Sequence, residues 1–371
     1  MDCPIPNARG VLRPEGTGAN GVLILGEAMG EDEAYDGLPF RPHAQSGSVL
    51  ERAIRKIGTN REQYVIWNVV PTHPPNNYLE GAPYCSAAIE WGRPQLEDMI
   101  ARYRPRCILA LGNIATRTLT GLAGPKMGVT HITGYVLPSR YGVPVVACLH
   151  PAFLRRGKMS HFGVLLRCLR LAIQIAREQR QALVPPVDDP PLGYILRPTR
   201  DDAYEFECAV RELNPTTSWL SYDIETMYST DEEDAEENPD AIRSIQFSIA
   251  PGSGIYLPWR EPFMSIAKRI LALRNRKCGW NNWRFDDPLL RANGCTIGGE
   301  NHDLMWAWHH SQPDLSKPGR GLQFAAAMQG PSITQPSHSW PWPWKHLDSQ
   351  SPEFYGIVDV DVLQWMVSYK F

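Results

Sequence analysis

The sequence lacks the cysteine patterns, long apolar runs and leader-like start that mark several special classes of protein. Its eight cysteines are scattered, with no CxxC pair, so neither a zinc ribbon nor a disulfide framework is indicated. No apolar run approaches the length of a membrane span, and the opening MDCPIPNARG has neither the charged nor the apolar region of a secretory signal. These absences favour a globular protein of a reducing cytoplasm, with no membrane attachment.

Length and charge distribution predict two domains. A chain of 371 residues exceeds one typical core. Residues 1–183 carry 21 Lys and Arg against 14 Asp and Glu, a net +7, whereas residues 184–371 carry 16 against 26, a net −10. A basic half beside an acidic half favours a nucleic-acid surface next to a metal-binding site. Part of the acidity has a simpler origin, because the acidic run Asp231–Asp240 is typical of a solvated loop.

A proline-rich stretch predicts the domain boundary. Residues 184–193, VPPVDDPPLG, hold four prolines, which cannot continue a helix and form a semi-rigid spacer. We therefore expect a first domain over residues 1–183, a linker over 184–193 and a second domain over 194–371.

Apolar strands alternate with helical patterns in the first half. A glycine-bearing turn follows the first strand, and a helix is expected at about 46–57. This alternation predicts a three-layer α/β domain with a mostly parallel sheet, whose site lies beyond the carboxyl ends of the strands. Pro94 predicts a late start or an interruption in the helical stretch after the second strand. The expected strands are Val22–Leu25, 64–70, 106–112 and 143–150.

Five short motifs stand at these strand ends and in the loops beside them. Each residue alone has an ordinary explanation as a turn former, a cap or core filler. Together, and in this order, the motifs resemble the uracil-DNA glycosylase superfamily, closest to its thermophile-type branch, over about residues 20–180. The motifs are GEAMG (26–30), GLPF (37–40), NVVPTHPP (68–75), PRCILALG (105–112) and HPAFLRR (150–156).

The resemblance implies a pocket that holds a base flipped out of DNA. Phe40 would stack on the base, and the Asn68 amide would read the edge that distinguishes uracil from cytosine. His150, together with backbone N–H groups of the Gly26–Gly30 turn, would stabilise negative charge on the departing base. Glu27 would position water or stabilise the cationic sugar.

The last motif implies contacts with the DNA around that base. Leu154 would insert into the vacated stack, while Arg155 and Arg156 would hold phosphates.

The chain departs from the thermophile-type pattern in its cysteines. That branch carries an iron–sulfur cluster on four cysteines, but Thr72 and Gly92 stand at two of the expected positions. Cys3 remains near the amino end, and Cys85 cannot complete a four-thiolate site alone. We therefore predict no iron–sulfur cluster. Met29 also replaces the usual proline of the first motif, and the loop after the second motif is longer, so the pocket is expected to be reshaped.

Three acidic motifs follow in the second half. Asp223 and Glu225 lie two apart on a predicted strand, SWLSYDIET, and therefore point the same way. Alone this pair more often marks a solvated strand end. Two further strands, forming an antiparallel meander with the first, lead to Asp286 on a helical pattern, and Tyr355 stands one helical turn before Asp359. Carboxylates gathered in this way suit a pair of magnesium or manganese ions, which drive phosphodiester cleavage.

These motifs resemble the DEDD-type 3′–5′ exonucleases, in the proofreading form of family A DNA polymerases. The resemblance covers about residues 195–371 and implies a ribonuclease H-like domain with a mixed sheet. By motif match Tyr355 would orient the attacking water. Asp361 is the nearest competitor for the third acid, but it lacks the preceding tyrosine. The residues that would hold the two ions are Asp223, Glu225, Asp286 and Asp359.

Three readings stay open at this point. The chain is a two-activity DNA enzyme, or its first domain is a non-catalytic reader of DNA or of an unusual base beside an active exonuclease. In a third reading, compatible with both, the two domains accompany a family A polymerase as a truncated product or a split gene. The combination is phage-like, which places the protein in a bacterial or infected-host cytoplasm. All three readings expect single-stranded DNA and DNA 3′ ends as partners.

Overall fold

The computed structural model describes residues 2–122, 128–179, 193–226, 241–313, 315, 321–329 and 352–368, with only the backbone at 329 and 352–355. The chain divides into two compact units, the first including Met1–Pro185 and the second beginning at Pro186. The expected linker 184–193 lies, apart from Gly193, outside the described residues, as does the acidic run Asp231–Asp240.

The first unit is built on a five-stranded sheet in the order β2-β1-β3-β5-β4. Its four long strands are parallel and fully or largely buried, whereas β4 runs antiparallel to β5 at the edge. The expected strands are therefore present, and they lie next to one another with their carboxyl ends on one edge. Their bounds are β1 Val22–Ala28, β2 Val65–Val70, β3 Cys107–Leu111, β4 Val136–Leu137 and β5 Val145–Cys148.

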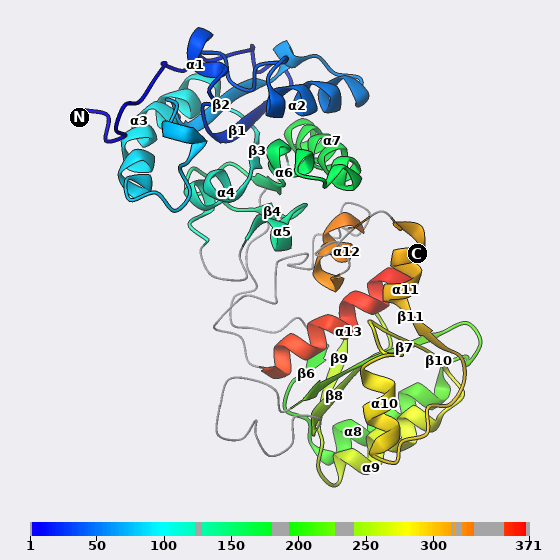
Figure 1. Ribbon diagram of the computed structural model, residues 1–371. Coiled ribbons are helices and arrows are strands. Elements are labelled where there is room, and N and C mark those ends of the chain that lie inside the picture. The colour runs from blue at the N-terminus through cyan, green and yellow to red at the C-terminus, as the bar shows by residue number, and fades with distance from the viewer. Residues whose placement is uncertain are drawn as a thin grey trace. The chain divides into compact units, whose positions relative to one another are not determined.

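Helices flank this sheet, with α3 and α4 on one side and α2 and α7 on the other (Figure 1). α7 packs against β1, β3 and β5. Short helices occupy the loops between strands. The helical bounds are α1 Glu33–Asp36, α2 Gln45–Lys56, η1 Arg61–Gln63, η2 Pro75–Asn77, α3 Cys85–Tyr103, α4 Asn113–Thr120, α5 Val129–Ile132, α6 Pro151–Arg155, η3 Met159–His161 and α7 Phe162–Glu178.

The interruption expected at Pro94 does not occur. α3 runs unbroken from Cys85 to Tyr103 with Pro94 inside it. The proline removes one helical hydrogen bond. Ala88, Gly92 and Leu96 recur at three- to four-residue spacing and are buried, and α3 packs against β2, so that burial outweighs the missing bond.

One helical stretch among the described residues, Met159–Glu178, is long and apolar enough to cross a membrane, with a mean hydropathy of 1.2. Half of that window is buried inside the protein, where α7 packs against the sheet. This is the behaviour of a core helix, so the stretch is weak support for a membrane span.

The second unit is built on a six-stranded mixed sheet in the order β11-β10-β7-β8-β9-β6. β7, β8 and β9 form the expected antiparallel meander, and β10 and β11 join β7 in parallel. The expected α/β class, with a mostly parallel first sheet and a mixed second sheet, is confirmed. The strands are β6 Tyr194–Ile195, β7 Trp219–Thr226, β8 Ile242–Ser248, β9 Gly254–Pro258, β10 Arg276–Gly279 and β11 Asn301–Asp303.

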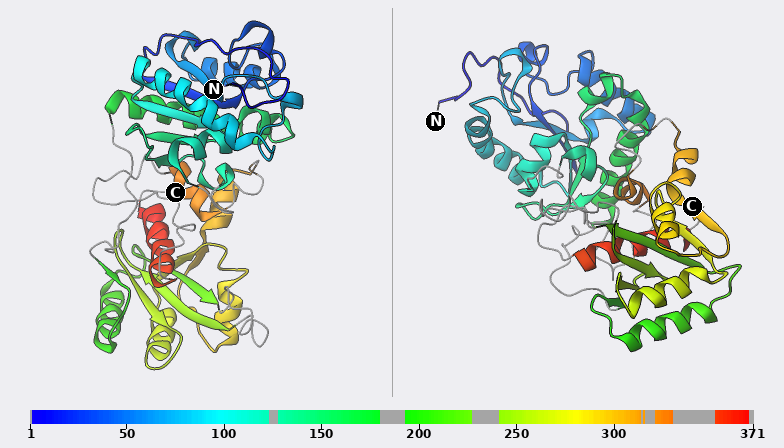
Figure 2. Two further views of the ribbon diagram at one scale, coloured as in Figure 1. Left: turned by 90° about the vertical axis from the view of Figure 1, so that its left-hand side faces the viewer. Right: turned by 60° about the horizontal axis from the view of Figure 1, so that its bottom comes forward.

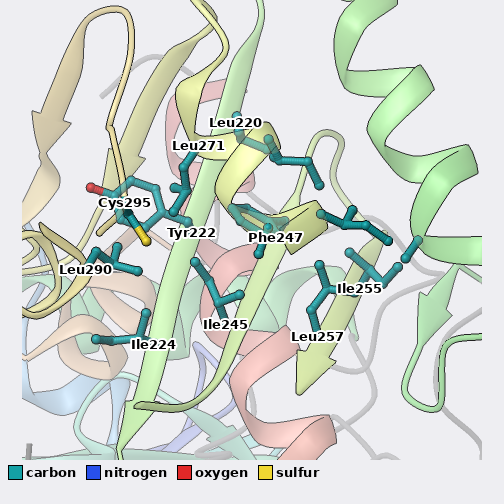
Figure 3. Packing of buried hydrophobic residues seen from close by; sticks show 14 of the residues in the cluster. Leu220, Tyr222, Ile224, Ile245, Phe247, Ile255, Leu257, Leu271, Leu290 and Cys295 are labelled. Atoms are coloured by element: carbon teal, nitrogen blue, oxygen red, sulfur yellow. The ribbon is translucent and has the colours of Figure 1, made fainter. Parts of the chain in front are cut away.

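A hydrophobic core covers one face of the second sheet. Leu220, Tyr222 and Ile224 of β7 meet Leu271 of α9 and Leu290 of α10 there (Figure 3). α13 packs along β7, β8 and β9 and lies beside that sheet in Figure 2. The helices are α8 Arg200–Glu212, α9 Phe263–Ala272, α10 Asp286–Ala292, α11 Leu304–Ser311, α12 Leu322–Gln329 and α13 Pro352–Ser368.

Candidate active sites

A cavity of about 570 Å³ opens in the first unit at the carboxyl ends of β1 and β5. The turn after β1, the loop that follows it, the start of α2 and the start of α6 all contribute to its wall. The wall carries both charge signs, with one acid from the end of β1, three from the segment that follows it, and two arginines from α6 and the residue after it. The residues that line it from the sequence-predicted set are Glu27, Gly30, Phe40, His150, Arg155 and Arg156.

Gly26, Phe40 and Asn68 meet at the base of this region. A Cβ atom on Gly26 would lie 2.4 Å from the Phe40 ring and 2.3 Å from Asn68 Oδ1, so only glycine lets the ring and the amide approach the strand end. Asn68 is fully buried, and among the described residues neither its Nδ2 nor its Oδ1 has a hydrogen-bond partner. Asn68 is not itself part of the cavity wall. A buried amide with an open donor and an open acceptor is unusual, because such groups are normally paired.

His150 is fixed by the start of α6. Its Nδ1 accepts a hydrogen bond from the backbone N–H of Ala152 at 3.1 Å, and its ring lies 5.5 Å from that of Phe40. Burial and the charge of Arg156 lower the pKa of His150 to about 4. The imidazole is therefore neutral at pH 7, with its proton on Nε2.

Two carboxyl groups in the cavity have raised pKa values. Burial, followed by the charge of Glu80, raises the pKa of Glu27 to about 6. Burial raises the pKa of Glu33 to about 7, although its Oε2 accepts the backbone N–H of Gly30 at 3.0 Å. Sequence reasoning missed Glu33, whose only signal was its place in an acidic loop directly after the first motif.

The residues of the HPAFLRR segment (150–156) differ in exposure, some being buried in the core and others exposed at the surface. Leu154 is fully buried on α6, so it is a core residue and cannot insert into DNA from this position. The burial of Leu154 therefore contradicts its expected insertion into the base stack of DNA. Arg155 and Arg156 are exposed and line the cavity, where they can contact phosphates.

The residues at the two cysteine positions do not fit an iron–sulfur cluster. The Thr72 hydroxyl lies 3.0 Å from the carbonyl oxygens of both Arg9 and Gly10, and thereby holds the amino-terminal segment. A Cβ atom on Gly92 would lie 2.2 Å from the Val69 carbonyl oxygen, so no cysteine side chain fits there without moving α3 away from β2. The absence of a cluster remains a prediction.

Three carboxylates come together in the second unit. Ligand oxygens of Asp223 and Glu225 on β7 and of Asp359 on α13 all lie within 4.8 Å of one another. Asp359 is buried, whereas the two strand residues are half-buried. Like charges held this close repel one another, and a group of hard oxygen ligands favours a divalent cation between them.

Asp286 lies beside this cluster. Its carboxylate accepts the backbone N–H of Ile224, the residue between Asp223 and Glu225, at 2.9 Å. Burial raises the pKa of Asp286 to about 7, and the charge of Glu225 acts in the same direction. The fourth expected acid therefore lies against the segment of β7 that carries Asp223 and Glu225, although it is not within the same 4.8 Å group.

Other nearby acids have structural partners. Asp361 accepts hydrogen bonds from the Tyr194 hydroxyl at 2.5 Å and from the Gly252 N–H at 2.6 Å. Asp303 accepts the N–H groups of Asn281 and Met305 at 2.9 and 3.0 Å. Neither acid belongs to the group of three carboxylates, and the choice of Asp359 over Asp361 as a metal ligand remains a prediction. Tyr355 lies in α13, and its side chain is outside the described residues.

Two exposed aromatic side chains precede Asp286 in the chain, and a third lies close to Arg284, the residue between them. Trp283, Phe285 and Trp306 are 50%, 45% and 40% exposed, and the Arg284 guanidinium lies 5.5 Å from the centre of the Trp306 ring. This aromatic group was not predicted from the sequence, although Trp283 and Phe285 lie within the motif NNWRFDD (281–287).

Comparisons with known proteins cover mainly the first unit. Residues 14–170 match the family described as the uracil DNA glycosylase superfamily. The chain is 35% identical over 161 residues to the type-4 uracil-DNA glycosylase of Pyrobaculum aerophilum, covering 42% of this chain and 78% of that protein. It is 31% identical over 159 residues to the type-4 uracil-DNA glycosylase of Thermotoga maritima, covering 43% and 79%.

A solved structure matches a larger share of the chain at lower identity. It is the crystal structure of the EXD2 exonuclease domain soaked in Mn and GMP, with 14% identity and a TM-score of 0.24, covering 48% of this chain and 86% of that one. A likeness of this strength supports no conclusion about fold or chemistry.

Proposed function

Because the chain belongs to the uracil-DNA glycosylase superfamily through residues 14–170, we propose that its first unit excises uracil, or a modified pyrimidine, from DNA. The observation that carries this proposal is the meeting of Phe40 and Asn68 at Gly26. The aromatic ring can stack on an extruded base, and the open donor and acceptor of the amide can pair with the edge of a pyrimidine.

The cavity residues supply the chemistry of bond cleavage. The Nε2–H of neutral His150 donates to the carbonyl oxygen that gains negative charge as the base departs. Glu27, when ionised, orients water or stabilises the positive sugar. Arg155 and Arg156 hold phosphates at the cavity mouth.

The alternative is a first unit that binds a base without excising it. Met29, in place of the usual proline, is buried in the cavity wall, and the longer loop brings Gln45 and Ser46 into that wall. The test is a uracil-bearing duplex incubated with the Asp223→Ala, Glu225→Ala protein and then treated with alkali. Cleavage at uracil supports excision, whereas tight binding with an intact strand supports the reader.

We further propose that the second unit is a metal-dependent 3′–5′ exonuclease acting on single-stranded DNA. The observation that carries it is the cluster of Asp223, Glu225 and Asp359 within 4.8 Å. With Asp286 they would hold two magnesium or manganese ions, which when bound activate water and stabilise the leaving 3′-oxygen. Tyr355 would orient the attacking water.

Double substitution of the strand acids tests the nuclease. Asp223→Ala with Glu225→Ala should abolish trimming of a 5′-labelled single strand in Mn²⁺, whereas Asp201→Ala, an acid on the first turn of α8, should leave it unchanged. Undiminished trimming by the double variant would contradict the proposal that these acids form a nuclease site.

The proposed exonuclease activity also points to a role in DNA replication or repair. Removal of nucleotides from 3′ ends is proofreading when a family A DNA polymerase supplies those ends, either as a partner or as a continuation of the chain. Such a pairing fits a phage-like replication or repair protein of the cytoplasm. Co-purification of a polymerase with the tagged chain tests it.

A further inference from the structure

A buried polar network lies behind the carboxylate cluster of the second unit. Because side chains alternate along a strand, Tyr222 of β7 points away from the face that carries Asp223 and Glu225. Tyr222 is fully buried, and its hydroxyl donates a hydrogen bond to Asp287 on the first turn of α10. The Nδ2 of buried Asn282 donates to the same hydroxyl at 2.8 Å.

The network closes through Asn301 on β11. Its Nδ2 donates to Asp287 Oδ2 at 2.8 Å, and its Oδ1 accepts from Asn282 Nδ2 at 3.1 Å. The backbone N–H of Asp287 also donates to the Asn282 carbonyl at 2.8 Å. Each member is bonded to at least two others, and connected buried networks of this kind hold their geometry firmly.

Asp286 and Asp287 are adjacent, yet they bond to different parts of β7. Asp287 holds the Tyr222 side chain, whereas Asp286 accepts the N–H of Ile224 at 2.9 Å. β7 and the start of α10 are thus joined at two points, one within the core and one beside the cluster. A shift of α10 that moved Asp286 would have to break the Asp287 network first.

We propose that Asp287 is a positioning residue for the metal site. Through Tyr222 it fixes the start of α10, and thereby keeps Asp286 next to Asp223 and Glu225. The inference rests on the proposed metal-dependent function of the second unit. Residues that orient metal ligands typically contribute 10- to 100-fold to metal affinity, although they never touch the ion.

Mn²⁺ binding to the full chain, measured by titration calorimetry, tests this role. Tyr222→Phe removes the hydroxyl and keeps the ring, and should weaken Mn²⁺ binding about 10- to 100-fold in a protein that still unfolds cooperatively. Asp287→Asn keeps the shape of the side chain but replaces one acceptor by a donor facing Asn301, and should weaken binding in the same way. If Tyr222→Phe does not fold, Mn²⁺ binding by the Asp287→Asn protein tests the positioning role instead.

Asn275→Ala is the control. Asn275 also makes a buried side-chain hydrogen bond in the same unit, from its Nδ2 to the Val210 carbonyl of α8 at 3.1 Å, but neither Asn275 nor α8 belongs to β7, α10 or α13, which carry the proposed metal ligands. The substitution should lower the unfolding temperature and leave Mn²⁺ affinity unchanged, as loss of a purely structural bond would. Wild-type affinity in Tyr222→Phe, or an equal loss in Asn275→Ala, would overturn the positioning role while leaving the metal site in place. A wild-type chain that binds no Mn²⁺ would overturn the metal site itself.

Discussion

The Nδ1 of His150 accepts the backbone N–H of Ala152 at 3.1 Å. This bond assigns the proton of the neutral ring to Nε2, and the lowered pKa of His150, about 4, keeps the ring neutral at pH 7. In the proposed excision, the charge on a departing base would therefore be stabilised by hydrogen bonding rather than by an imidazolium cation.

The pH dependence of base excision should follow Glu27 and not His150. With a pKa of about 6, Glu27 becomes ionised as pH rises, so kcat/KM should be half-maximal near pH 6 and level off above about pH 7. His150 stays neutral throughout this range and adds no inflection. Single-turnover rates from pH 5 to 8 measure the profile.

Glu33 provides the control for that profile. Glu33→Gln removes the neighbouring carboxyl, whose pKa is about 7, and should leave the inflection near pH 6 in place. A rate that falls as pH rises above 6.5 would mean that a protonated group is required, contrary to stabilisation of the departing base by neutral His150.

Gly26→Ala should disrupt the base pocket. The added methyl group would lie 2.3 Å from Asn68 Oδ1 and 2.4 Å from the Phe40 ring, which forces both side chains to move. We expect a loss of about 1–3 kcal/mol in the free energy of unfolding, as for other overpacked sites, and loss of uracil binding.

Gly163→Ala is the matched comparison for Gly26→Ala. It lies in α7 with nothing within 4 Å of a new methyl group, so it should be neutral or stabilise by up to about 1 kcal/mol. Denaturant unfolding and uracil-oligonucleotide binding measure both variants. A Gly26→Ala protein with normal binding would contradict the assigned pocket.

Restoring cysteines should not restore a cluster. Thr72→Cys with Gly92→Cys supplies two thiols, but the Cβ of residue 92 would meet the Val69 carbonyl oxygen at 2.2 Å. We expect a destabilised protein with no bound iron, whereas wild type should be stable and also free of iron. Iron content and unfolding temperature test this, and stoichiometric iron in either protein would refute it.

The exposed aromatic group should bind single-stranded DNA. Stacking of one base on one aromatic ring contributes about 1–3 kcal/mol, so Trp283→Ala or Trp306→Ala should weaken binding of an oligothymidine about 5- to 150-fold. Tyr35→Ala, an 82% exposed aromatic of the first unit, should have no effect on the same measurement. Equal affinities of wild type and the three variants for the oligothymidine would show that Trp283 and Trp306 do not bind single-stranded DNA.

The strands and the carboxylate cluster followed from sequence because both depend on local pattern. Apolar runs fixed the strand positions, and the two-residue spacing of Asp223 and Glu225 fixed their common side on β7. Asp359 was singled out by its spacing from Tyr355 on an apolar helical pattern, but its place beside β7 is a tertiary contact, since nothing local to α13 indicates which strand it packs against.

Other features depend on tertiary contacts that no local pattern encodes. Leu154 was expected to reach DNA because of its motif, yet it is buried on α6. Pro94 was expected to break α3, but packing on β2 maintains the helix. Asp286 and Asp287 are neighbours of the same type, and only their partners, Ile224 and Tyr222, distinguish a site residue from a network residue.

The two proposed activities on DNA should be separable within one chain. The most direct measurement uses a 5′-labelled single strand with one internal uracil, incubated with wild-type protein in EDTA or in Mn²⁺ and then treated with alkali. We predict one break at uracil in EDTA and a ladder of products shortened from the 3′ end in Mn²⁺. An intact strand in EDTA, or a ladder that persists in EDTA, would contradict it.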